Sequence, residues 1–168
     1  MRRNLNYLRQ GCTTVVSGNC GGGTMDIAAY FARLEREGAG TNVILLVPHG
    51  SVRAKAMGSD NRPPTASELE RMQALVERGM REGAWGISTG LIYPPGMFAQ
   101  ADELVALAKV VARHDGLCVS HIRNEADGLL RALQEAIQIG REAGLPVHSR
   151  ISRRSGRRTG DRCAKRRR

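Results

Sequence analysis

The chain has 168 residues, 41% of them hydrophobic, which is enough for one ordinary domain with an apolar core. Its formal net charge of +10 is concentrated at one end, because residues 149–168 carry ten Lys and Arg side chains against one acid, whereas residues 1–148 carry sixteen basic and fifteen acidic ones. The charge of the body therefore does not indicate a nucleic-acid or membrane partner.

The four cysteines, Cys12, Cys20, Cys118 and Cys163, show neither a CxxC spacing nor the framework of a small secreted protein. We therefore expect a reducing, cytoplasmic setting. No apolar run reaches the roughly 18 residues that a membrane span needs, and the basic start is followed by no apolar signal segment.

The hydrophobic patterns predict strands that alternate with helices along the chain. A capping-box spacing at Thr65–Glu68 marks one helix start, and glycines mark several helix ends. In order, we predict a helix at 4–10, a buried strand at 12–17, a glycine-rich turn at 18–23, a helix at 25–37, a strand at 42–47, a polar loop at 51–64, a helix from 65 to Gly83, a strand at 84–89, a helix at 101–114, a buried strand at 117–123, a helix at 124–143 and the start of a strand at 145–148.

Four strand–helix units and the start of a fifth strand predict an α/β fold with a parallel sheet. The strands are continuously apolar, which is typical of sheets buried on both faces. The unit length of about 30–35 residues suits a (β/α)₈ barrel or an open doubly wound sheet. A closed barrel needs eight units, so the sequence predicts a partial TIM-type barrel of about four to five units.

Polar side chains follow the predicted strands where each strand ends. In a parallel barrel these ends share one face, where active sites form. A cysteine and a histidine from separate strand ends are suitable ligands for Zn²⁺. The groups are Asn19 and Cys20, His49, Ser88, Thr89 and Tyr93, Ser120, His121 and Arg123, and His148.

Other interpretations of these residues remain open. His121 also suits a buried histidine that only forms hydrogen bonds, and Cys20 a small residue in a glycine turn. We interpret His49 as a turn or substrate-side residue rather than a metal ligand, and His114 as a histidine favourable at a helix end. Residues 18–23 also suit a phosphate cradle before a helix, although they lack the P-loop and dinucleotide patterns.

Residues 149–168 change character abruptly and contain almost nothing to bury, so we expect a disordered, Arg-rich tail. One interpretation is a tail that binds nucleic acid or acidic lipid without sequence specificity, since it has no aromatic residue for base stacking. The other is a non-native end, such as a reading-frame slip. We favour the second, because the break falls inside what should be a core strand.

Five motifs occur in an order that resembles the N-acyl-D-amino-acid deacylases (D-aminoacylases) of the amidohydrolase superfamily. The resemblance covers about residues 4–148, and the STGLIYPPG and SHIR stretches together make it specific. The motifs are SGNCG at 17–21, PHGSVR at 48–53, AMG at 56–58, GISTGLIYPPG at 86–96 and SHIRNE at 120–125.

The resemblance implies a (β/α)₈ barrel, a zinc ion, and hydrolysis of the amide in N-acyl-D-amino acids to a carboxylate and a D-amino acid. Cys20 matches the family's metal-binding cysteine, and His121 matches the histidine ligand on its strand. Tyr93 and Arg123 lie beside these residues in the motifs and are expected to contact the small-molecule substrate. The resemblance implies no specific nucleic-acid or membrane partner and leaves the oligomeric state open.

Several family features are missing from the sequence. The His-x-His metal pair is expected before Met1, the next histidine ligand is replaced by Ile151, and the catalytic aspartate is expected after Arg168. We therefore expect residues 1–148 to be an incomplete amidohydrolase barrel with no catalytic residue of its own. We expect this chain alone to bind zinc weakly or not at all, and to show no turnover.

Overall fold

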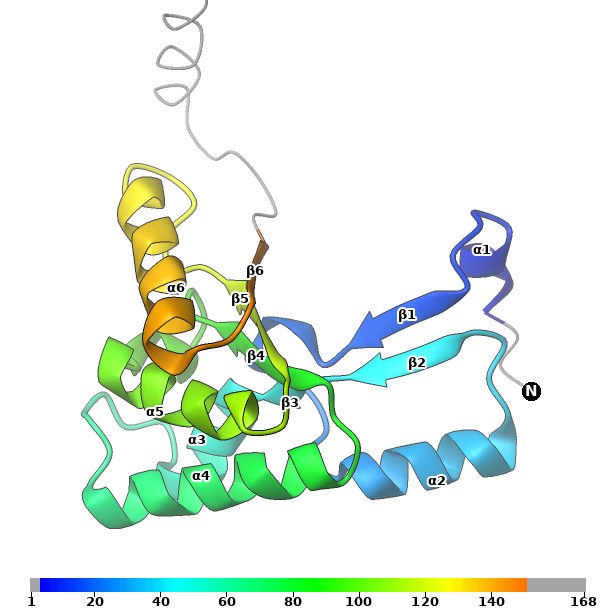
Figure 1. The fold of residues 1–168 in the computed structure, drawn as a ribbon, viewed down its shortest axis with the longest axis horizontal. Coiled ribbons are helices and arrows are strands. Elements are labelled where there is room, and N and C mark those ends of the chain that lie inside the picture. Colours follow the sequence, from blue (N-terminus) through cyan, green and yellow to red (C-terminus); the bar gives the residue numbers. More distant parts are fainter. Residues whose placement is uncertain (1–3, 151–168) are drawn as a thin grey trace, which may run out of the picture.

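A computed structural model describes residues 4–150 (Figure 1). Strands and helices alternate along the chain, as the hydrophobic patterns predict. The elements are α1 (Leu5–Leu8), β1 (Thr14–Ser17), the 3₁₀ helix η1 (Asn19–Gly21), α2 (Ile27–Glu37), β2 (Asn42–Leu45), β3 (Val47–Pro48), α3 (His49–Met57), α4 (Ala66–Arg81), β4 (Gly86–Gly90), the 3₁₀ helix η2 (Gly96–Phe98), α5 (Ala101–Ala112), β5 (Leu117–His121), α6 (Leu129–Ala143) and β6 (Val147–Arg150).

All the strand pairs are parallel. β1 pairs with β2, and β3, β4, β5 and β6 follow one another in a four-stranded sheet. The two sheets are connected at Leu46, whose N–H donates to the Ser17 carbonyl at 3.1 Å, and at Trp85, whose N–H donates to the Leu45 carbonyl at 2.9 Å. The larger helices lie along one side of the strands and leave the other side open (Figure 1). This is the arrangement of a (β/α) barrel that is not closed.

The apolar core lies between the strands and these helices. β4 is buried along its whole length, and the helices contribute fully buried residues such as Met72, Val76 and Leu107. The predicted capping box of α4 is confirmed, because the Thr65 hydroxyl accepts from the Glu68 N–H and a Glu68 carboxylate oxygen accepts from the Thr65 N–H at 2.8 Å.

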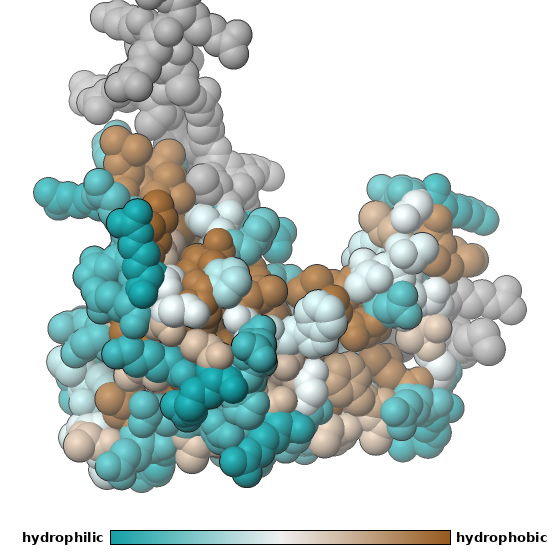
Figure 2. All heavy atoms as spheres, viewed as in Figure 1, coloured by the Kyte–Doolittle hydropathy of each residue, from teal (hydrophilic) through white to brown (hydrophobic). Residues whose placement is uncertain are grey.

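The opposite face of the strands surrounds an apolar hollow of about 580 Å³. It is lined by Val16, Ile44, Leu46, Trp85, Leu117 and Val119 among others, and Figure 2 shows apolar residues around the notch between the two arms of the molecule. The sequence predicts β1 as a buried strand, and this is wrong: Val16 is 47% exposed, since nothing in residues 4–150 covers its side of the sheet.

Two further predictions differ from the structure. Within the expected polar loop at 51–64 the chain forms α3, because the His49 and Arg53 side chains point into the core. The helix expected from residue 124 begins at Leu129, after a turn. β6 reaches Arg150 and so includes the first two residues of the expected Arg-rich tail, whose other residues lie outside the described ones.

Between residues 4 and 150, no helix is long and apolar enough to cross a membrane.

Candidate metal centre

The structure brings together two side chains that are 101 positions apart in the chain. Cys20 lies in η1, directly after β1, and His121 is the last residue of β5. The Cys20 Sγ atom is 3.4 Å from Nδ1 of His121. Both belong to the end of the sheet at which barrel active sites form.

Cys20 reaches this position through an unusual backbone. Its φ of 60° and ψ of 27° place it in the left-handed region, which a residue with a side chain seldom adopts. The loop crosses the end of β4, where Ser88 holds it: the Ser88 hydroxyl donates to the Gly18 carbonyl and accepts from the Gly21 N–H at 3.2 Å. β4 thus positions Cys20 above the neighbouring strand.

His121 is 4% exposed and is surrounded by contacts that fix its ring. Nε2 lies 3.1 Å from Oε1 of Glu125. The Tyr93 ring meets the imidazole edge-on, with centroids 5.2 Å apart and an interplanar angle of 90°. Nδ1 is the ring nitrogen directed at Cys20.

The donor atoms of Cys20 and His121 suit one zinc ion. Zn–S and Zn–N bonds of about 2.3 and 2.0–2.1 Å at a tetrahedral angle put sulfur and nitrogen about 3.6 Å apart, and the observed separation is 3.4 Å. Thiolate and imidazole are also the ligand types that zinc prefers. No cluster of three or more His, Cys, Asp or Glu side chains suited to a metal occurs within residues 4–150. Cys20 and His121 are therefore two candidate ligands, fewer than the three or four protein ligands that zinc usually takes, and their role as ligands stays a prediction.

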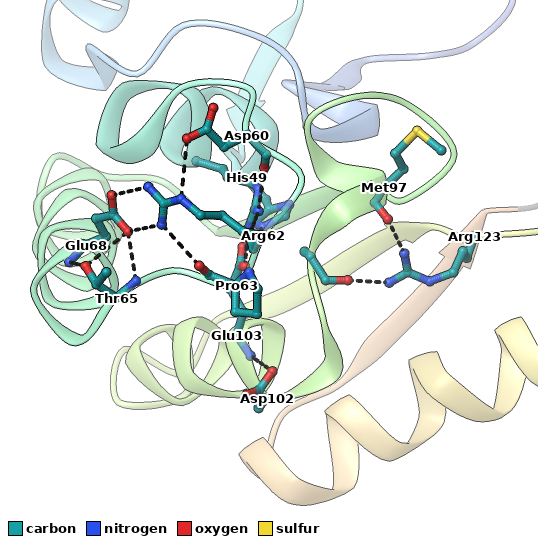
Figure 3. A network of polar contacts seen from close by, with 12 residues as sticks. His49, Asp60, Arg62, Pro63, Thr65, Glu68, Met97, Asp102, Glu103 and Arg123 are labelled. Atoms are coloured by element: carbon teal, nitrogen blue, oxygen red, sulfur yellow. Dashed lines mark hydrogen bonds and ion pairs between the residues drawn. The ribbon is translucent and has the colours of Figure 1, made fainter.

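Tyr93 and Arg123 lie near this centre in different ways. Tyr93 is 49% exposed and lines a small pocket of about 220 Å³ together with Cys20 and several glycines. The Arg123 guanidinium donates to the carbonyls of Met97 and Ala99 at 2.6 and 2.8 Å and pairs with Glu135 at 2.8 Å. Arg123 therefore ties η2, through the Met97 carbonyl shown in Figure 3, to Glu135 of α6. Its contact with a substrate stays a prediction.

The interpretation of His49 as a turn or substrate-side residue is wrong. His49 begins α3, is fully buried, and its Nε2 lies 2.8 Å from Oε1 of Glu103. Arg53, also fully buried, donates to the other oxygen of Glu103. Burial alone would raise the pKa of Glu103, but the hydrogen bonds and charges of His49 and Arg53 outweigh it, and the pKa lies below its usual value.

The roles of Glu103, Arg53 and Glu125 were not predicted from the sequence. A signal for the first two is present: His49 and Arg53 are four residues apart, the spacing of one helix face, and Glu103 precedes the apolar Leu104 and Val105 of α5. Glu125 stands inside the SHIRNE motif, but its contact with His121 depends on the turn that follows β5.

The interpretation of residues 18–23 as a phosphate cradle is not supported. α2 begins at Ile27, and its free N–H groups already have carboxylate partners. Asp26 accepts from the Ala29 N–H at 3.0 Å, and Glu82 accepts from the N–H groups of Ile27 and Ala28. His148 is likewise not part of the centre, because it lines the apolar hollow.

Parallel strands with helices outside, and a cysteine and a histidine meeting at the strand ends, define an α/β protein of the metal-dependent barrel class. The chain is 34% identical over 163 residues to a D-aminoacylase of Alcaligenes xylosoxydans xylosoxydans, and this match covers 83% of the chain and 34% of the D-aminoacylase. It is 38% identical over 157 residues to an N-acyl-D-glutamate deacylase of the same organism, covering 80% and 32%. No protein-family model matches the chain.

Solved structures that match this chain are also deacylases of this kind. The N-acyl-D-glutamate deacylase of Bordetella bronchiseptica, crystallised with zinc and a phosphonate mimic of the tetrahedral intermediate, matches with a TM-score of 0.80 and 38% identity, over 96% of this chain and 40% of that one. The expected relationship and the partial-barrel fold are therefore confirmed: the chain belongs with the N-acyl-D-amino-acid deacylases of the amidohydrolase superfamily. It spans about a third of the length of the curated relatives that it matches.

Proposed function

We propose that this chain is part of a zinc-dependent hydrolase that cleaves the linear amide C–N bond of N-acyl-D-amino acids. The observation that carries the proposal is the 3.4 Å separation of Cys20 Sγ and His121 Nδ1 at the strand ends, in a chain similar to deacylases of this specificity. In this proposal residues 1–148 form the incomplete barrel and residues 149–168 a tail without a role in the chemistry.

Each residue has a proposed task. Cys20 as a thiolate and His121 as a neutral imidazole hold zinc, which when bound supplies a Lewis acid and a water that is acidic near neutral pH. Tyr93 borders the pocket beside Cys20 and is proposed to contact substrate. Arg123 is proposed to act beside it, either directly or by holding η2 in place through the Met97 and Ala99 carbonyls. No residue of this chain is proposed as the catalytic base.

The cytoplasm is the proposed compartment, without a membrane or specific nucleic-acid partner. Among the described residues Cys12, Cys20 and Cys118 are free thiols, which supports a reducing environment.

A metal titration of the 168-residue chain tests the site. Co²⁺ bound by a cysteine gives a thiolate-to-metal charge-transfer band, and we expect a weak band because residues 4–150 offer two candidate protein ligands. Cys20→Ser and His121→Asn should abolish the band, whereas Cys12→Ser, an exposed thiol away from the centre, should leave it. The same band in all four proteins would refute the metal centre.

A chimaera tests the reaction. Residues 4–150 replace the corresponding segment of the Alcaligenes D-aminoacylase, to which the chain is 34% identical, and hydrolysis of N-acetylated D-amino acids is measured. We expect activity that is lost with Cys20→Ser and kept with Cys12→Ser, and no hydrolysis by the unmodified chain alone. A folded chimaera without activity, or one indifferent to Cys20→Ser, would contradict the proposal.

A further inference from the structure

Both nitrogens of the His121 ring have a partner. Nδ1 faces the Cys20 sulfur at 3.4 Å, and Nε2 faces the Glu125 carboxylate at 3.1 Å. The contact with Glu125 is shielded, because the His121 side chain is 5% exposed and the Glu125 side chain 10% exposed. Water therefore competes little for either nitrogen, and the two partners decide where the ring hydrogen resides.

Glu125 is held in place by its own turn. The Asn124 side-chain oxygen accepts from the N–H groups of Ala126 and Gly128, at 2.8 and 3.2 Å. On the other side of this turn, Arg123 donates to the Met97 carbonyl at 2.6 Å (Figure 3) and also pairs with Glu135. The turn after β5 thus presents the Glu125 carboxylate to the His121 ring.

The chemistry of the two partners determines which nitrogen of the His121 ring carries the hydrogen. A carboxylate only accepts hydrogen bonds, so the nitrogen that faces Glu125 carries the hydrogen. In a neutral imidazole the other nitrogen then has a free lone pair. That nitrogen is Nδ1, which points at Cys20. The edge-on Tyr93 ring, 5.2 Å away, packs against the imidazole in this orientation.

We propose that Glu125 is a positioning residue for His121: it keeps the imidazole in the Nε2–H form, so that the lone pair of Nδ1 is available beside Cys20. The role of this lone pair as a metal donor rests on the proposed function, but the tautomer itself does not.

The tautomer is measured directly by long-range ¹H–¹⁵N correlation of the ring nitrogens in the metal-free, 168-residue chain. The chain has four histidines, and His121→Asn identifies the signals of interest. In the wild type we expect a pyrrole-like Nε2 and a pyridine-like Nδ1. Glu125→Ala should move both shifts toward averaged values, and Glu125→Gln, which keeps an oxygen acceptor, should restore the Nε2–H form.

Glu142→Ala is the matched control, since Glu142 is an exposed carboxylate of α6 that accepts a hydrogen bond from Gln138 rather than from His121 or Arg123. Its tautomer should equal that of the wild type. Circular dichroism of each variant separates loss of fold from a local change. Unchanged His121 shifts in a folded Glu125→Ala chain, or an Nδ1–H form in the wild type, would overturn the proposal.

The Co²⁺ band provides the second readout. Partners of metal-bound histidines typically affect affinity 10- to 100-fold, so Glu125→Ala should raise the Co²⁺ Kd by about that factor while Glu142→Ala does not. If the wild type gives no band but Glu125→Ala still shifts the tautomer, the metal centre fails and the role of Glu125 stands. If the band is present but neither readout responds to Glu125→Ala, the role of Glu125 fails and the metal centre stands.

Discussion

The carbonyl oxygen of Cys20 lies directly against Gly90, so closely that a Cβ atom on Gly90 would overlap it. The same is true in reverse, since a Cβ on Gly21 would lie 2.8 Å from the Gly90 N atom. The Cys20 loop therefore rests on the bare backbone at the end of β4. This contact allows a side chain from the loop after β1 to reach the end of β5, the strand that pairs with β4.

Gly90→Ala should consequently destabilise the fold and displace Cys20. Forcing a methyl group into a packed site costs about 1–3 kcal/mol, and here the obstacle is backbone that cannot rotate away. We expect a lower urea midpoint by circular dichroism and a weaker Co²⁺ band. Gly22→Ala is the control, because nothing lies within 4 Å of its Cβ position; equal effects of the two variants would show that the contact is unimportant.

Ser88→Ala should loosen the same loop through its hydrogen bonds. The variant leaves the Gly21 N–H without the hydroxyl that accepts from it at 3.2 Å, and an unsatisfied buried polar group costs about 1–3 kcal/mol. We expect that loss in urea unfolding, with a weaker Co²⁺ band. Ser59→Ala, at an exposed turn, should change neither measurement. A Co²⁺ band as strong as that of the wild type in a destabilised Ser88→Ala chain would show that Ser88 contributes to stability but does not position Cys20.

Thr65→Ala should remove the cap of α4 at a cost of about 1 kcal/mol. The Thr65 hydroxyl accepts a hydrogen bond from the Glu68 N–H, and the Glu68 carboxylate accepts one from the Thr65 N–H. Equilibrium urea unfolding measures the loss, with exposed Ser59→Ala again as the reference. Thr65→Ser keeps the hydroxyl and should recover most of the difference; no recovery would mean that the methyl group, rather than the cap, supplies the stability.

The features predictable from sequence are those with local causes. The capping box at Thr65 needs only four consecutive residues, and β5 follows from a short apolar run, although it ends at His121 rather than at the predicted residue 123. The meeting of Cys20 and His121 follows from a topological rule, because parallel strands present their carboxyl ends at one edge. Its chemical meaning came from the resemblance rather than from periodicity.

The features that were not predicted from the sequence depend on which distant residues pack against, or fail to cover, a given segment. The exposure of Val16 in β1 is decided by the absence of a covering layer within residues 4–150, which no local pattern reports. The helix α3 forms in a polar stretch because His49 and Arg53 find Glu103, about 50 positions later, in the core. A polar stretch is therefore predicted as a loop unless the buried residue that pairs with its side chains is known.

The buried network of His49, Arg53 and Glu103 supports two further predictions. Glu103→Gln removes the charge opposite Arg53, whose side chain is fully buried, and removing one partner of a buried pair costs about 3–5 kcal/mol. Glu70→Gln, an exposed glutamate of α4, should have little effect in the same urea titration at neutral pH. The double variant Arg53→Met with Glu103→Leu should be less damaging than Glu103→Gln, because it leaves no uncompensated charge.

The same pair makes stability depend on pH in a defined direction. The pKa of Glu103 is lowered in the folded chain: burial opposes this, but the contacts of His49 and Arg53 prevail. A carboxylate with a depressed folded pKa stabilises the fold above its unfolded pKa of about 4.3, and this contribution is lost as pH falls through the folded value. The difference in unfolding free energy between wild type and Glu103→Gln should therefore be constant from pH 7 to about 5 and shrink below about 4.3. A difference that grows toward acid would mean that Glu103 is protonated in the fold at neutral pH.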